Sequence, residues 1–179
     1  MIDNNTCINI CQINGPKENI EHIDRLLNED FSMNSLISIY DINNNIDRLI
    51  EWGCEEDMEL LTYISCGFND PQTIDMTYIT DIPNTLFLKV ISSKYNLTIE
   101  HAFNDYENGY VGYNKIVNGE LEEFEYEEDN TSQKYIDLQK QYNFYSDEEM
   151  KEMELENTST QQQTIISMQD ILKLKNKGE

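Results

Sequence analysis

The chain has 179 residues, of which 35 are acidic and 12 are basic, so its formal net charge at pH 7 is −23. This charge argues against direct binding of nucleic acid, because proteins that bind it present basic patches. It favours solubility and a basic partner surface. The length suits one domain with additions, and a hydrophobic fraction of 39% indicates that part of the chain lies outside a packed core.

The cysteine pattern predicts free thiols. Cys7, Cys11, Cys54 and Cys66 form no Cys-x-x-Cys pair, and the two histidines add no finger-like spacing. The sequence shows no signal peptide and no apolar run near 18 residues. We therefore expect a reduced, cytoplasmic setting with no membrane association, no metal and no cofactor.

The first half of the chain predicts a strand, a helix and two less regular stretches. Residues 6–13 alternate in polarity, which indicates a buried strand. Pro16 precedes apolar residues at helical spacing that continue to about Asn28. Residues 31–40 fit a strand or an irregular segment, and a short helix is expected over 46–52.

Further strands and a second long helix follow. Residues 60–68 predict a strand, and residues 72–82 are expected to be irregular. A helix is expected from Pro83 to about residue 95, and a strand over 97–103. The apolar residues at core spacing on that helix are Leu86, Phe87, Val90 and Ile91. On the strand, His101 is expected to be a core or edge residue rather than a catalytic one.

The most distinctive stretch, residues 109–129, predicts a β-hairpin. Asn118-Gly119 is a strong turn signal, because both central residues of a type I′ turn need positive φ. An aromatic and β-branched strand precedes the turn, and the strand from Glu120 to about Glu127 is largely acidic. Strict alternation puts Glu120, Glu122, Phe124 and Tyr126 on one face and Leu121, Glu123, Glu125 and Glu127 on the other.

Acidic residues on one face of this strand recur at roughly 6.6–6.8 Å, about twice the axial charge spacing of one DNA strand. A backbone-like arrangement of charge is therefore geometrically available. A solvated edge strand is the alternative, since charge on an edge discourages aggregation. Residues 31–60 are a second acidic stretch. They contain seven acidic residues and one basic residue, Arg48, for a net charge of −6.

The last fifty residues differ from the rest in composition. Residues 132–145 predict an amphipathic helix, and Ser146 to Glu149 form a capping box for a second one. A polar linker over 157–164 precedes a last helix over 165–177. We expect this helix to dock on the domain, to pair with a second copy or to engage a partner.

The order of elements predicts an α+β fold, with helices on one face of a mostly antiparallel, ferredoxin-like sheet and a helical C-terminal extension. Residues 1–129 are expected to form the domain and 130–179 a partly flexible extension. The stretches CINICQINGPKENI at 7–20 and LFLKVISSKYNLTIEHAFNDYENGYVGYNKIVNGEL at 86–121 resemble the YubB-type ferredoxin-like domain family of phage and plasmid proteins. The resemblance implies a fold and a mobile-element origin, and it transfers no active site.

Charge and resemblance together favour a non-enzymatic inhibitor. The expected partner is the basic surface of a host defence nucleic-acid-binding protein, such as a CRISPR effector or a restriction-type nuclease, in the host cytoplasm, and one mode of inhibition is nucleic-acid mimicry. The alternatives are a small-molecule-sequestering protein or a phage accessory module, with Tyr106, Tyr110, Tyr113 and Phe124 lining a pocket or an oligomer interface. The expected partner-binding residues are Glu120, Glu122, Glu123, Glu125, Glu127, Glu128 and Asp129, with Glu55, Glu56 and Asp57. No hydrolase, P-loop or zinc-protease motif predicts an enzyme.

Overall fold

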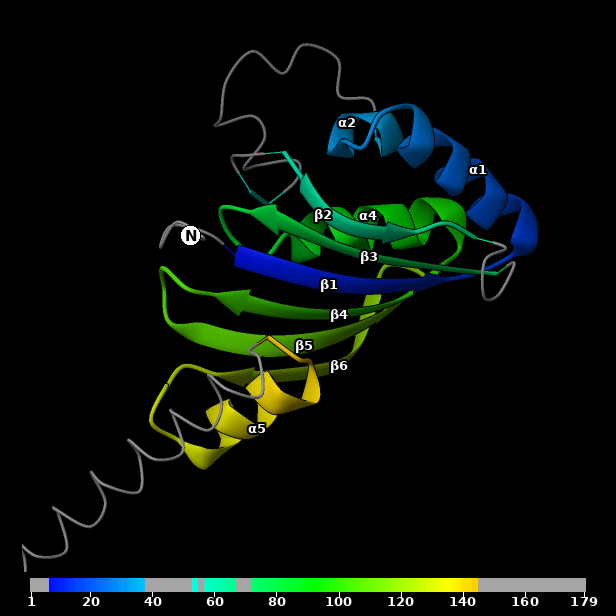
Figure 1. The fold of residues 1–179 in the computed structure, drawn as a ribbon. Helices are drawn as coiled ribbons and strands as arrows, with labels where there is room; N and C mark the ends of the chain where they lie inside the picture. Colours follow the sequence, from blue (N-terminus) through cyan, green and yellow to red (C-terminus); the bar gives the residue numbers. More distant parts are fainter. Residues whose placement is uncertain (1–6, 38–52, 55–56, 67–71, 145–179) are drawn as a thin grey trace, which may run out of the picture. The chain divides into compact units, whose positions relative to one another are not determined.

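A computed structural model describes residues 7–37, 53–54, 57–66 and 72–144. These residues form a six-stranded sheet in the order β2-β3-β1-β4-β5-β6, in which all neighbours are antiparallel (Figure 1). The strands are β1 (Cys7–Asn14), β2 (Glu59–Ile64), β3 (Thr73–Thr80), β4 (Thr98–Asp105), β5 (Tyr110–Val117) and β6 (Glu120–Glu127). The helices are α1 (Lys17–Glu29), α2 (Met33–Leu36), α4 (Thr85–Tyr95) and α5 (Gln133–Gln141).

The connectivity explains the predicted fold class, which is confirmed. The elements β1, α1, β2, β3, α4 and β4 follow one another in the βαββαβ order, and their strands lie in the order β2-β3-β1-β4. That is the ferredoxin-like arrangement. The hairpin β5–β6 continues the sheet beyond β4, so β6 is one edge and β2 is the other. The hairpin is therefore an addition to the four-stranded core.

The prediction that residues 72–82 are irregular was wrong. Residues Thr73–Thr80 form β3, which lies between β1 and β2 and hydrogen-bonds to both. Its apolar residues Ile74, Met76 and Tyr78 are fully buried, and Gln12 on β1 donates to the Asp75 carboxylate at 2.9 Å. The segment TIDMTYIT alternates apolar and polar residues and is rich in threonine, isoleucine and tyrosine, which favour strands, so the prediction missed a strand signal that the sequence contains.

Two helices cover one face of the sheet. Ile20, Ile23 and Leu27 of α1 and Phe87, Leu88 and Ile91 of α4 share one core with strand residues such as Ile13 and Ile99. The predicted helical stripe on α4 was partly wrong, because Leu86 and Val90 are 44% and 39% exposed. The true stripe is rotated toward Leu88 and Ser92.

The core beside the start of α4 is polar. The ring of His101, predicted to lie in the core or at an edge, is fully buried, with Nε2 at 2.9 Å from Asn9 Oδ1. Asn114 Nδ2 lies 3.3 Å from His101 Nδ1 and donates to Thr85 Oγ1 at 2.9 Å. Burial lowers the pKa of His101 to about 3, so the ring is neutral at pH 7 and forms part of the structure.

The chain divides into two compact units, Met1–Leu138 and Gln139–Glu179. Helix α5 falls within the predicted 132–145 helix. The short helix expected over 46–52 and the helices expected beyond residue 146 lie outside the described residues. In the part that is described, no helix is long and apolar enough to cross a membrane. No disulfide joins the four cysteines, and three of them, Cys7, Cys11 and Cys54, are buried.

Candidate partner-binding surface at the acidic edge strand

The predicted hairpin is present, and α4 holds its turn. Asn118 and Gly119 have φ values of 51° and 84°, as a type I′ turn requires. The Gly119 N–H donates to Ser92 Oγ at 3.0 Å, and a Cβ at Gly119 would lie 2.8 Å from Ser93 Cβ. Glycine is therefore required both for the backbone angle and for the close approach of α4.

A β-bulge changes the predicted faces of β6. Lys115 pairs with Glu123 whereas Ile116 pairs with Leu121, so Glu122 is the extra residue. Paired residues share a face. The face toward α1 and α4 therefore carries Leu121, Phe124 and Tyr126, and the opposite face carries Glu120, Glu123, Glu125 and Glu127. Strict alternation had placed Glu120 with Phe124 and Leu121 with Glu123, which was wrong because alternation fails across a bulge.

The seven acids of residues 120–129 differ in what already engages them. Glu127 Oε1 accepts from the N–H groups of Glu128 and Asp129, at 3.1 and 3.0 Å. Glu128 Oε2 accepts from Tyr126 Oη at 3.0 Å, and Asp129 Oδ1 accepts from the Thr131 N–H and hydroxyl. These three carboxylates shape the turn after β6, and hydrogen bonding lowers the pKa of Asp129.

The remaining acids are more accessible. Glu123 lies 3.4 Å from the Lys115 ammonium across the strand pair. Within the described residues, no hydrogen bond or ion pair engages the side chains of Glu120, Glu122 and Glu125, and all three are exposed. Of the seven acids, Glu120, Glu122 and Glu125 are therefore the ones that the described residues leave free to meet a partner.

Asp57, the one described residue of the second predicted acid cluster, lies at the other edge of the sheet. Asp57 lies two residues before the start of β2, and its Oδ1 accepts from the N–H groups of Met33 and Met58 at 2.7 and 2.8 Å. Asp57 therefore caps the start of α2. Five strand spacings separate β2 from β6, about 24 Å at the usual spacing. Glu55 and Glu56 lie outside the described residues, and Asp57 does not share a surface with the acids of β6.

An exposed apolar strip lies beside the acids. Of its residues, the sequence interpretation named Phe124 alone, as a residue of a pocket or an oligomer interface. Phe124 is 58% exposed, the most of any large apolar residue described, and Leu121 and Tyr126 are 41% and 37% exposed on the same face. Helix α4 contacts β6, and its exposed Leu86 and Val90 line an open groove that ends at the hairpin turn. The alternation of Phe124 and Tyr126 with glutamates was the sequence signal that could have indicated this strip.

The aromatic residues predicted to share a pocket or an interface lie on two faces. The Tyr110 and Tyr126 ring centroids are 5.3 Å apart, and Phe124 stacks on Tyr126 with centroids 6.1 Å apart. Tyr113 pairs with Glu125 and therefore lies on the acidic face. The groove at α4 has a volume of about 570 Å³ and is lined by other residues: Leu86, Lys89, Val90, Ser93, Lys94, Asn118, Gly119 and Glu120.

The comparison with protein families agrees with the fold. Residues 82–164 match the model of the ferredoxin-like domain in Api92-like protein. The match spans a little under half of the chain and includes α4, the strands β4 to β6 and α5. No curated protein and no solved structure matches the chain. The matched family model supports a ferredoxin-like domain and includes the acidic edge strand within that domain.

Proposed function

We propose that this protein is a non-enzymatic binding protein that engages the basic surface of a host nucleic-acid-binding protein and excludes its nucleic acid. The observation that carries the proposal is the exposed edge strand β6, on which Glu120, Glu122 and Glu125 have no partner within the described residues. An acidic protein of net charge −23 associates quickly with a basic groove, and the rate falls steeply with salt.

The proposed partner belongs to the class of host defence nucleases, such as CRISPR effectors or restriction-type enzymes. The resemblance of 7–20 and 86–121 to the YubB-type domains of phages and plasmids supports a mobile-element origin, where such inhibitors act. Glu123, Glu125 and Glu127 recur on one face of β6 at roughly 6.6–6.8 Å, about twice the axial charge spacing of one DNA strand. This spacing supports mimicry of a phosphate backbone as the mode of inhibition.

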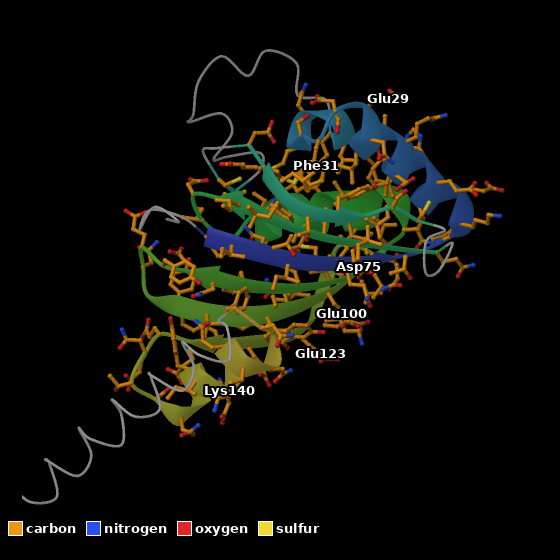
Figure 2. The ribbon with its side chains drawn as sticks, in the orientation of Figure 1. Glu29, Phe31, Asp75, Glu100, Glu123 and Lys140 are labelled. Atoms are coloured by element: carbon orange, nitrogen blue, oxygen red, sulfur yellow. The ribbon has the colours of Figure 1, made fainter. Side chains whose placement is uncertain are left out.

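The test is retention of such a nuclease on the immobilised full chain, at low and at moderate salt, with DNA or RNA as competitor. The double variant Glu122→Lys/Glu125→Lys should weaken retention about tenfold or more, because it replaces attraction by repulsion at the contact. Glu29→Lys/Glu107→Lys is the matched control with the same change in net charge. Figure 2 shows Glu29 far from Glu123, and both control residues are exposed.

The two variants separate a local contact from a general effect of charge. Retention that falls equally in both variants would mean that only the net charge matters. Retention unchanged in the β6 variant, or not competed by nucleic acid, would contradict the proposal.

The open groove at α4 favours a second candidate, a protein that sequesters a small molecule. Its volume of about 570 Å³ is within the range of ligand sites, and apolar Leu86 and Val90 lie in it beside Lys89. Native mass spectrometry of protein purified from cell extract would show a retained metabolite of defined mass. Loss of that mass in Val90→Asp would assign the metabolite to this groove.

A further inference from the structure

We propose that β6 is a docking edge for an extended polypeptide strand in which basic and apolar side chains alternate. The inference rests on the proposed function and specifies how its basic partner is recognised. Strand addition uses the unpaired main-chain groups of an edge for affinity and the alternate side chains for specificity. Three features of β6 support the assignment. It is an edge strand, its outward main-chain groups are unpaired by a neighbouring strand, and its two faces differ in chemistry.

The outward main-chain groups of β6 can be identified from one contact. Tyr126 O accepts from Lys134 Nζ at 3.0 Å, so this carbonyl points away from β5. Carbonyl directions alternate along a strand in an antiparallel pair. The Phe124 carbonyl and N–H therefore also point outward, at the free edge of the sheet. An incoming strand would find hydrogen-bonding groups at both Phe124 and Tyr126.

The two faces of β6 define the side chains of that strand. A residue opposite Phe124 or Tyr126 lies over exposed aromatic surface, 58% and 37% exposed, so an apolar side chain gains by burial there. A residue opposite Glu123, Glu125 or Glu127 faces carboxylates, where lysine or arginine is favoured. Because strand faces alternate residue by residue, the partner must alternate basic and apolar residues.

Other occupants fit less well. A second copy of β6 would place glutamates opposite glutamates, which destabilises a strand pair. Nucleic acid carries the same sign of charge as the acidic face. The Lys134 ammonium on the Tyr126 carbonyl shows a cation at this edge already, and a docking strand would have to displace it. Lys134 should therefore weaken docking.

In the experiment, the full chain is titrated with a synthetic octapeptide in which lysine and valine alternate. Calorimetry measures the affinity, and amide hydrogen exchange identifies the protected residues. The alternating peptide should bind and protect the Phe124 and Tyr126 amides. A peptide of the same composition in two blocks, and an alternating peptide N-methylated on its valines or on its lysines, should bind roughly fivefold or more weakly. Glu125→Lys should weaken binding by a similar factor, and Lys134→Met should strengthen it about two- to threefold.

Each outcome decides the inference. Equal binding of the block peptide would leave only charge attraction, and unprotected Phe124 and Tyr126 amides would exclude strand addition. Self-association through β6 in the absence of peptide, detected as protection of the same amides at high protein concentration, would make a second copy the occupant. If the peptide fails while a nuclease is still retained through Glu122 and Glu125, strand docking is wrong and the proposed function stands. If the peptide binds while no nuclease is retained, strand docking stands and the proposed function is wrong.

Discussion

Acidic residues lie at both edges of the sheet, but they are engaged by the protein itself at the β2 edge and are largely exposed to solvent at the β6 edge. At the β2 edge, Asp24 of α1 accepts from Tyr63 Oη at 2.6 Å, from Ser65 Oγ at 2.7 Å and from the Cys66 N–H at 3.1 Å. Asp57 caps α2 at the same edge. These carboxylates join helices to a strand. At the β6 edge, several carboxylates face solvent. An acidic residue is therefore informative about a partner only when its own fold leaves it unengaged.

The edges also differ in how they avoid unwanted pairing. β2 exposes Leu60, Leu61 and Ile64, has Glu59 as its one charged residue and shifts register against β3 between Leu60 and Thr62. β6 has five glutamates, a bulge at Glu122 and a lysine on one outward carbonyl. Charges and bulges of this kind prevent edge-to-edge aggregation. On β6 the negative charge that disfavours pairing with another acidic strand favours a partner of opposite charge. The same glutamates can therefore prevent aggregation and recognise a basic partner.

The largest expected effect on stability is at Asp24. Asp24→Ala removes a carboxylate that receives three donors, and hydrogen bonds to charged groups are worth about 1.5–3 kcal/mol. We expect the free energy of unfolding to fall by about 2 kcal/mol in urea denaturation. A loss below about 0.5 kcal/mol would mean that the β2 edge uses its acids no more than the β6 edge does.

The pH dependence of stability tests the same residue. Partial burial would raise the pKa of Asp24, but the hydrogen bonds from Tyr63, Ser65 and Cys66 outweigh it and lower the pKa. A lowered folded-state pKa contributes stability above the unfolded value, about 3.9, that is lost as pH falls through the folded value. The difference in unfolding free energy between the native chain and Asp24→Asn should thus be full at pH 7 and shrink below pH 4. A difference that stays constant down to pH 2.5 would contradict this assignment.

Asp57→Ala should have an intermediate effect. It removes the acceptor for the Met33 N–H at the start of α2, and the loss of a helix cap typically costs about 1 kcal/mol. Urea denaturation measures the change. Asp57→Asn keeps an acceptor oxygen and should recover about half of the loss, which separates capping from charge.

Substitutions at the β6 edge should have the smallest effects on stability. Glu125→Ala removes an exposed side chain without a partner within the described residues, and surface changes of this kind stay within about 0.5 kcal/mol. Glu123→Gln breaks the exposed pair with Lys115, worth about 0.2–1 kcal/mol at most. A loss above about 1.5 kcal/mol in either variant, measured in the same urea series, would show that these acids are structural and remove the contrast between the edges.

Local sequence patterns were sufficient to predict the elements whose conformation depends on residues close by in the chain. The Asn118-Gly119 turn, the helix after Pro16 and the buried strand at the N-terminus follow from φ preferences and apolar periodicity. The α+β class followed from the order of these elements. The place of His101 among apolar strand residues predicted a core or edge position, and the structure places it in the core.

Only the tertiary structure decided which acids are available. The bulge at Glu122 depends on how β6 pairs with β5, and it moves Glu120 to the acidic face and Leu121 to the aromatic one. The use of Asp57 as a cap depends on α2, a contact across 24 sequence positions. A charge run specifies electrostatic potential, whereas pairing register and long-range hydrogen bonds specify which charges remain free. The sequence by itself therefore determined the acidity and the hairpin, and the packing of β6 against β5 and α4 decided the surface that a partner would meet.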